Sequence, residues 1–166
     1  MKKYLLLLFV TFVSVAQAQD LTGYRGEFNL SHSIGVRAFT FDKISVHTIQ
    51  GLQAGESCFA GLGFGVDYYK NLTDNGELIT PVYLHIENYL QANKEYKPFI
   101  SLDFGVGFGL TDNMKQKSGI MYKPSIGVIS NGLKFQFGYN IQHKYVAPLD
   151  KVCNLECVEF LIGVTF

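Results

Sequence analysis

Apolar and polar residues alternate along most of the chain with a period of two. In the last stretch, VEFLIGVTF, every second position from Val158 to Phe166 is apolar. Strict alternation is typical of a β-strand with one face against an apolar environment. From Tyr24 onward the pattern predicts eight strands and no helix of period 3.6. The predicted strands are Tyr24–Ser33, Lys43–Gln53, Ser57–Tyr69, Ile79–Leu90, Pro98–Leu110, Ile120–Ser130, Leu133–Gln142 and Cys157–Phe166.

The lengths of the segments and of their connections predict an all-β, antiparallel up-and-down barrel that crosses a membrane. A tilted membrane-spanning strand needs about 9–11 residues, and each of these segments is close to that length. The sequences AGE at 54–56 and NG at 131–132 predict tight turns. Longer polar connections alternate with them at 70–77, 111–118 and 143–156. Short turns on one rim and long loops on the other are the layout of bacterial outer-membrane barrels. The connection at residues 91–96 is longer than the short turns of this layout.

The two faces of each segment indicate which solvent the barrel wall meets. The fifth segment alternates a large apolar set with a small or polar set: Ile100, Leu102, Phe104, Val106, Phe108 and Leu110 against Ser101, Asp103, Gly105, Gly107 and Gly109. The interior of an eight-stranded barrel is only just wide enough for side chains. A soluble barrel would also leave its outside as bare glycine backbone. The large apolar faces, including that of the last strand, are therefore predicted to contact lipid.

The inward faces carry charges that nearly balance. Charges in an interior of low dielectric constant persist only when they are paired and hydrogen-bonded. The pattern therefore predicts a plugged polar core and no aqueous channel. Inward glycines of the third and fifth segments flank large inward residues of the fourth, which is the complementarity that fills a narrow barrel. The predicted lumen cluster is Arg25, Glu27, Lys43, Asp67, His85, Glu87, Asp103, Lys123, Lys134 and Glu159.

Composition and the first residues bear on the cellular address. Lys2 and Lys3, an apolar run and AQA at 16–18 predict a signal peptide over residues 1–18, with the barrel domain at 19–166. The apolar run is shorter than the about 20 residues of a membrane-spanning helix. Acidic and basic residues number 14 each, so the electrostatic footprint of nucleic-acid binding is absent. A charged content of 17% suits a bilayer-facing surface better than a soluble one.

Five stretches resemble small outer-membrane β-barrel proteins of the Bacteroidetes type. They are GYRGEFNLSHSIG at 23–35, GLGFGVDYY at 61–69, KPFISLDFGVGFG at 97–109, YKPSIGV at 122–128 and FLIGVTF at 160–166. The layout is similar to OmpX-like and OmpA-like eight-stranded barrels. The resemblance covers essentially the whole mature chain and implies a location in the Gram-negative outer membrane, with lipid and the outer-membrane assembly machinery as partners. Phe166 resembles the aromatic end of the signal which that machinery reads.

No catalytic, cofactor or metal site is predicted. A zinc site needs converging ligands, whereas His32, His47, His85 and His143 are dispersed and are interpreted as lumen or rim residues. Cys153 and Cys157 flank NLE in a predicted loop. A disulfide between them is predicted, with free thiols or a loop metal site as the alternatives, and bridging requires Cα atoms about 4.4–6.8 Å apart. Cys58 belongs to an outward apolar set.

Three functions compete on this fold. The leading hypothesis is a non-enzymatic, monomeric barrel that presents surface loops for adhesion, envelope integrity or partner binding. The second is a lipid A-modifying acyl hydrolase or transferase, which needs a serine, a histidine and a carboxylate together. Ser31, His32 and Ser33 are adjacent, but neighbours on a strand face opposite ways. The third is a periplasmic, lipocalin-like carrier of a small apolar ligand.

Overall fold

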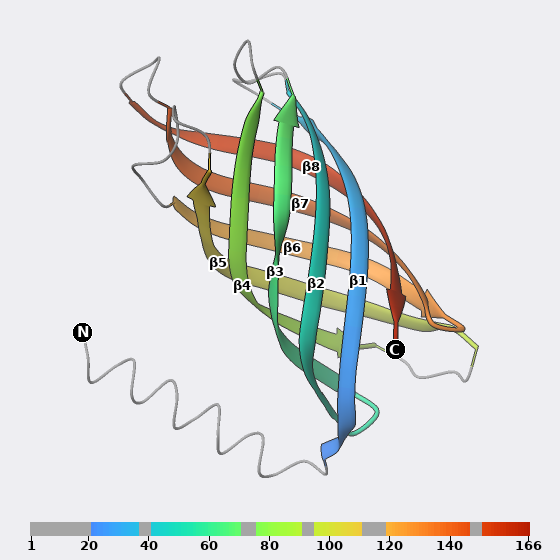
Figure 1. The fold of residues 1–166 in the computed structure, drawn as a ribbon. Coiled ribbons are helices and arrows are strands. Elements are labelled where there is room, and N and C mark those ends of the chain that lie inside the picture. Colours follow the sequence, from blue (N-terminus) through green and yellow to red (C-terminus); the bar gives the residue numbers. More distant parts are fainter. Residues whose placement is uncertain (1–20, 37–40, 71–75, 91–94, 111–118, 147–150) are drawn as a thin grey trace, which may run out of the picture.

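Eight antiparallel strands close into a barrel in which each strand pairs with its neighbours in the sequence and β1 pairs with β8 (Figure 1). The computed structural model describes residues 21–36, 41–70, 76–90, 95–110, 119–146 and 151–166. The all-β, eight-stranded up-and-down barrel predicted from the sequence is confirmed. Its strands are β1 Leu21–Gly35, β2 Asp42–Ala54, β3 Cys58–Lys70, β4 Glu77–Tyr89, β5 Lys97–Gly109, β6 Gly119–Ser130, β7 Leu133–Val146 and β8 Lys151–Thr165. Within these ranges, no helix is long and apolar enough to cross a membrane.

The last two strands are longer than the sequence pattern predicted. Residues 143–156 were expected to form a loop, yet β7 and β8 remain paired as far as Val146 and Lys151. The difference has a physical reason, because backbone hydrogen bonds continue a ladder whatever the side chains are. The apolar alternation marks only the part of a strand that faces an apolar environment.

Two tight turns, the start of β1 and the end of β8 lie at one rim of the barrel, called here the turn rim. Asn131 and Gly132 have φ angles of 48° and 81°, the left-handed conformation that a type I′ hairpin requires. Gly55, at the turn between β2 and β3, has a φ of 58°. The connections on the opposite rim, called the loop rim, fall largely outside the described residues. The predicted short-turn side is therefore present at both hairpins.

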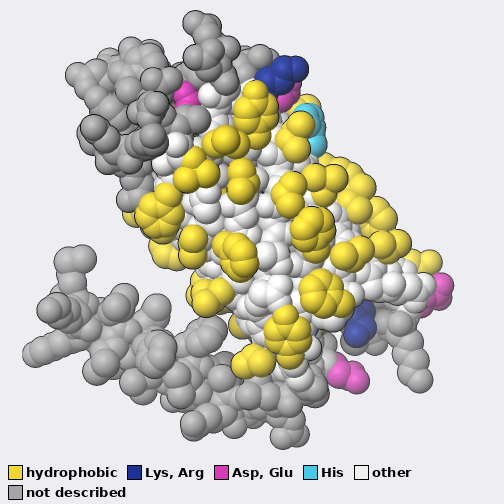
Figure 2. Space-filling model, in the orientation of Figure 1, with side chains coloured by type: hydrophobic (Ala, Val, Ile, Leu, Met, Phe, Trp, Pro, Cys, Tyr) yellow, Lys and Arg dark blue, Asp and Glu magenta, His cyan; other side chains and the backbone are white. Residues whose placement is uncertain are grey.

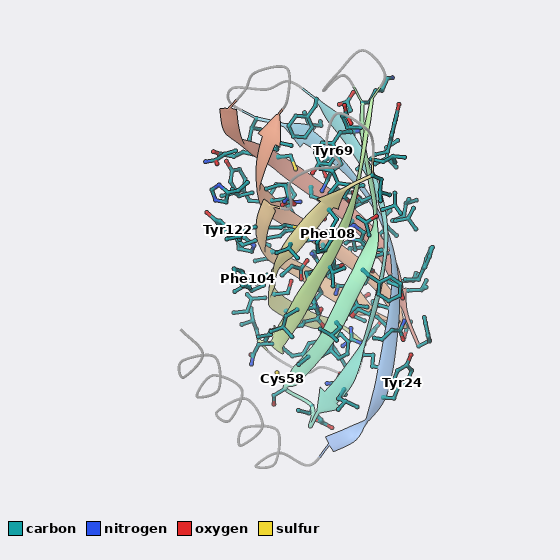
Figure 3. The ribbon with its side chains drawn as sticks, turned by 60° about the vertical axis from the view of Figure 1, so that its left-hand side comes forward. Tyr24, Cys58, Tyr69, Phe104, Phe108 and Tyr122 are labelled. Atoms are coloured by element: carbon teal, nitrogen blue, oxygen red, sulfur yellow. The ribbon has the colours of Figure 1, made fainter. Side chains whose placement is uncertain are left out.

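Large apolar side chains point outward around the barrel wall. Figure 2 shows them spread over the strands, with charged side chains toward the two ends. Phe104 of β5 is 57% exposed, and Phe104 and Tyr122 of the neighbouring β6 project away from the barrel (Figure 3). Phe160, Ile162, Val164 and Phe166 of the last strand are exposed in the same way. The outward and inward faces predicted from the alternation are those of the structure.

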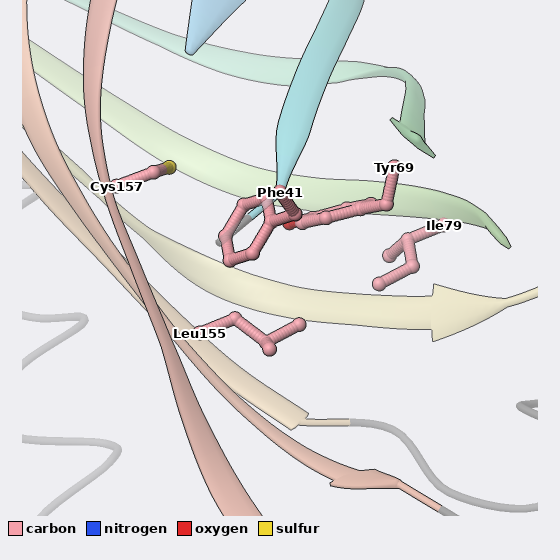
Figure 4. Packing of buried hydrophobic residues seen from close by; sticks show 5 residues of the cluster. All are labelled: Phe41, Tyr69, Ile79, Leu155 and Cys157. Carbon is pink, nitrogen blue, oxygen red and sulfur yellow. The ribbon is translucent and has the colours of Figure 1, made fainter. Parts of the chain in front are cut away.

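The lumen also contains three apolar clusters, which the prediction of a polar core did not include. Phe41, Tyr69, Ile79, Leu155 and Cys157 pack together toward the loop rim (Figure 4). The Phe41 and Tyr69 rings are 5.2 Å apart between centroids. Two further clusters, which lie deeper and toward the turn rim, are formed by Ile49, Phe59, Tyr83 and Met121, and by Tyr89, Phe99 and Ile129.

Candidate functional site

The most concentrated chemistry of the molecule is an ionic network inside the barrel. The structure brings together all ten ionisable side chains that the sequence placed in the lumen. Every one is buried except Arg25, whose side chain is 12% exposed. All eight strands contribute to this lumen network: Arg25 and Glu27 from β1, Lys43 from β2, Asp67 from β3, His85 and Glu87 from β4, Asp103 from β5, Lys123 from β6, Lys134 from β7 and Glu159 from β8.

Glu159 is the centre of the half nearer the loop rim. Its carboxylate accepts hydrogen bonds from Lys43 Nζ at 2.9 Å and from Lys123 Nζ at 2.7 Å. Ser33 Oγ donates a third hydrogen bond at 3.2 Å. Lys43 Nζ is also 3.8 Å from Asp67. Two buried cations thus share one carboxylate, which is the arrangement that makes charges tolerable in a dry interior.

Lys134 is the centre of the half nearer the turn rim. Its Nζ donates to Glu27 Oε2 at 2.8 Å and to Glu87 Oε2 at 2.7 Å. Arg25 contacts the same two carboxylates, at 2.5 Å and 3.1 Å, and its guanidinium lies 4.4 Å from the centroid of the Phe59 ring. The two glutamates, from β1 and β4, therefore share two cations, from β1 and β7.

His85 joins the two halves. Its Nδ1 is 2.5 Å from Asp103 Oδ1, and its Nε2 is 3.6 Å from Glu87 Oε2. Asp103 is in turn 3.0 Å from Lys123 Nζ. The lumen network is therefore continuous from Asp67 to Arg25, with alternating signs of charge along most of its length.

His47 and Tyr83 extend the lumen network and were not in the predicted cluster. His47 Nε2 is 2.8 Å from Asp67 Oδ1, and Tyr83 Oη is 3.2 Å from His47 Nδ1. The alternation of side chains along a strand could have identified both as lumen residues. His47 lies four residues after Lys43, and Tyr83 lies two residues before His85, so each shares a face with a predicted lumen residue. Both positions share the inward face of their strands.

Tyr83 fits between two glycine positions, as the sequence predicted. It lies opposite Gly63 on β3 and Gly105 on β5. A Cβ added to Gly63 would overlap the Tyr83 ring, and one added to Gly105 would lie 2.5 Å from the Tyr83 Cα. The third and fifth strands must therefore lack side chains here for β4 to present a large one.

One group of lumen residues has the composition of a metal site. Single ligand atoms of Glu27, His85 and Glu87 lie within 4.8 Å of one another. The Lys134 ammonium group, however, already binds both glutamates, so a divalent ion would have to displace a buried cation. The donors fit a metal poorly for this reason, and the absence of a metal site stays a prediction from the sequence.

The serine and histidine residues that could form a catalytic pair are separated by the barrel wall. Ser31 and Ser33 are buried in the lumen, whereas His32 is exposed on the outside. Among the described residues, no hydrogen bond joins a serine hydroxyl to a histidine ring. The separation of His32 from Ser31 and Ser33 expected from strand geometry is therefore present, so these three residues do not form the serine–histidine pair that acyl transfer needs.

The predicted disulfide between Cys153 and Cys157 requires a correction. Both residues lie in β8, which is continuous from Lys151 to Thr165. Four residues of extended chain span about 13 Å, well beyond the separation that a disulfide can bridge. Cys157 is a free, buried thiol, and Cys58 is a free, half-buried one at the start of β3. The predicted disulfide is thus wrong, because the residues expected to form a loop belong to a strand.

Comparisons with known proteins identify the fold. No family model and no curated protein sequence matches the chain. Among solved structures, Neisserial surface protein A is similar over 89% of this chain and 98% of its own, with a TM-score of 0.65 and 12% identity. The outer membrane enzyme PagL is similar over 82% and 98%, with a TM-score of 0.59 and 14% identity. The N-terminal β-barrel domain of Pseudomonas aeruginosa OprF is similar over 86% and 97%, with a TM-score of 0.54 and 11% identity.

These similarities concern architecture. The chain has the eight-stranded barrel fold seen in an outer membrane enzyme and in a bacterial surface protein. At identities this low, the likeness carries no residue role from those proteins to this one.

Proposed function

We propose that the protein is a non-enzymatic, monomeric outer-membrane barrel with a plugged lumen. The observation that carries this proposal is that the distribution of side chains is the reverse of that in a soluble protein. Large apolar side chains are exposed on the outside of the barrel, and an ionic network is buried inside. Soluble monomers rarely expose contiguous apolar patches larger than a few hundred Å². Alternation of apolar-out and polar-in residues is the pattern of strands that span the outer membrane.

The proposed location in the outer membrane rests on this apolar wall and on the signal peptide predicted in the first residues of the chain. Residues 1–20 lie outside the described residues, so the signal peptide at 1–18 and the mature domain at 19–166 remain proposals from the sequence. The finer assignment, to the small OmpX-like and OmpA-like barrels of the Bacteroidetes type, is likewise proposed. In this arrangement the turn rim faces the periplasm, as short turns do in bacterial outer-membrane barrels.

The proposed role is to hold surface loops on a rigid wall for adhesion, envelope integrity or partner binding. The lumen supports it indirectly, because paired charges and packed aromatic rings fill the space that transport would need. The proposed partners are outer-membrane lipid, the assembly machinery that would read Phe166, and a surface partner of unknown identity; no nucleic acid is among them.

Cell fractionation and lipid analysis test this proposal together. The protein should sediment with the outer membrane, and lipid A from wild-type and deletion cells should give identical acyl patterns by mass spectrometry. A changed acyl pattern would contradict the non-enzymatic role. Recovery of the protein in the periplasm would instead contradict the membrane location.

A lipid A-modifying enzyme stays the second candidate, since one protein with a similar fold, PagL, is an outer membrane enzyme. The same lipid A comparison decides between the two roles. A lipocalin-like carrier is not proposed, because such a protein needs an apolar cavity where this lumen holds a buried ionic network.

A further inference from the structure

The outer wall carries an apolar groove of about 490 Å³ that crosses β6 and β7 in the half of the barrel nearer the turn rim. Leu90 and Pro98 lie at one end of it, and Phe160 of β8 lies at the other. Most of its lining is outward-facing, and the lumen network occupies the opposite face of the same strands. The exceptions are Phe99 and Gln136, which are buried on the lumen side next to Gly127.

Two rows of outward side chains form the walls of the groove. Val128 and Phe135 are paired across β6 and β7 in the row nearer the turn rim. Ile126 and Phe137 are paired in the next row, which Phe160 continues on β8. The backbone of the row between them, which includes Gly127, is the floor.

The chemistry of the lining restricts what the groove can bind. Among the described residues that line it, none is charged, and its one polar side chain, Gln136, is buried. A ligand recognised through hydrogen bonds or charge finds no partner there. The strands below are paired on both sides, so a partner protein has no free sheet edge to which it could add a strand.

We propose that this groove binds one acyl chain of a phospholipid in the membrane leaflet on the turn-rim side. The inference rests on the proposed membrane location, from which it follows that the groove opens into hydrocarbon and is continuous with a lipid-facing wall. A chain lying between the two rows contacts side chains on both flanks, and so makes more contacts than a chain resting on a flat surface. Dispersion contacts of this kind are individually small and collectively large.

Native mass spectrometry of the purified mature barrel, mixed with phosphatidylethanolamine in detergent, tests the proposal. Ile126→Trp should fill the groove, and Leu62→Trp on β3 is the matched control, because Ile126 and Leu62 are 62% and 63% exposed on the outer wall. Wild type and Leu62→Trp should retain one phospholipid at collision energies that remove detergent. Ile126→Trp should lose it. Heat-dependent electrophoretic mobility checks that all three proteins are folded.

Three results would overturn the proposal: no phospholipid retained by wild type, equal retention by all three proteins, or a dimer that Ile126→Trp dissociates. The last result would mean that the groove is a contact between two copies. Flotation with vesicles of phosphatidylethanolamine and phosphatidylglycerol separates this failure from that of the proposed function. Wild type that floats but retains no lipid contradicts only the groove, whereas wild type that does not float contradicts the membrane location as well.

Discussion

At the scale of single residues, adjacent positions on β5 face opposite environments. Phe104 is exposed on the wall and Gly105 packs against Tyr83 and the carbonyl of Val82. In a bilayer, Phe104→Arg should lower the free energy of unfolding by about 2–4 kcal/mol, whereas Phe104→Leu should be mild. Gly105→Leu should be destabilising by about 1–3 kcal/mol or more through overpacking.

Urea unfolding of these variants in lipid vesicles measures the differences, with Gly105→Gln as an added control. A soluble, lipocalin-like barrel with reversed faces would have Gly105 on the outside and would accept a large polar residue there. A soluble barrel with the present faces would tolerate Arg at Phe104, because that side chain would meet water. Unchanged stability of Phe104→Arg in vesicles would therefore remove the basis for the lipid-facing wall.

Replacing Lys134 in the lumen network should destabilise the barrel. Lys134 is fully buried between Glu27 and Glu87, so Lys134→Met leaves two carboxylates with only Arg25 between them. Breaking a buried pair by removing one partner costs about 3–5 kcal/mol. Lys70→Met, at an exposed position near the end of β3, is the control and should have little effect. If unfolding in vesicles shows the two variants to be equally stable, the lumen network does not stabilise the barrel.

At the scale of elements, the pairing of β7 with β8 determines the chemistry of the cysteines. Because Cys157 packs inside the barrel with Phe41 and Leu155, its thiol should resist alkylation in the folded protein. In denaturant without reductant it should become fully alkylated, since no disulfide holds it. Mass spectrometry of the alkylated peptide measures both. Cys58, half-buried on the outer side of β3, is the internal control and should react more readily in the folded state. Protection of Cys157 that persists in denaturant and disappears with reductant would restore the disulfide.

The contact between β1 and β8, which closes the barrel, includes the last residue of the chain. The backbones of Gly26 and Phe166 exchange hydrogen bonds of 2.7 Å and 2.9 Å. A Cβ on Gly26 would lie 2.5 Å from the Phe166 ring. The last residue therefore covers a position of the first strand that lacks a side chain, which ties the two ends of the barrel together.

At the scale of the whole molecule, the filled lumen predicts the transport behaviour. Barrels with water-filled channels typically have 16–18 strands, whereas this one has eight, and the charges in its lumen are paired with one another. The mature protein in planar bilayers should therefore give no stable porin-like conductance. Small flickering currents are compatible with rearranging ion pairs, but large and steady single-channel steps would contradict the plugged lumen.

The strands and the faces of the barrel could be predicted from the alternation of apolar and polar residues alone. Alternation is local, since each side chain points opposite to its neighbour, so Phe104 and Gly105 could be assigned without knowing any strand partner. Hydropathy also located the strand cores, but it could not locate the ends of β7 and β8, where polar residues continue the ladder. The disulfide error at Cys157 came from that limit.

Which charges meet in the lumen could not be predicted from the sequence. Lys134 binds Glu27 and Glu87, which are 107 and 47 positions away in the chain. The inward parity of all three was readable, but the parity of a strand says nothing of its stagger around a closed barrel. The register of eight strands and the closure of β1 on β8 set which residues face each other across the lumen, and this depends on every pairing at once. The same is true of the three apolar clusters and of the outer groove, whose walls come from different strands.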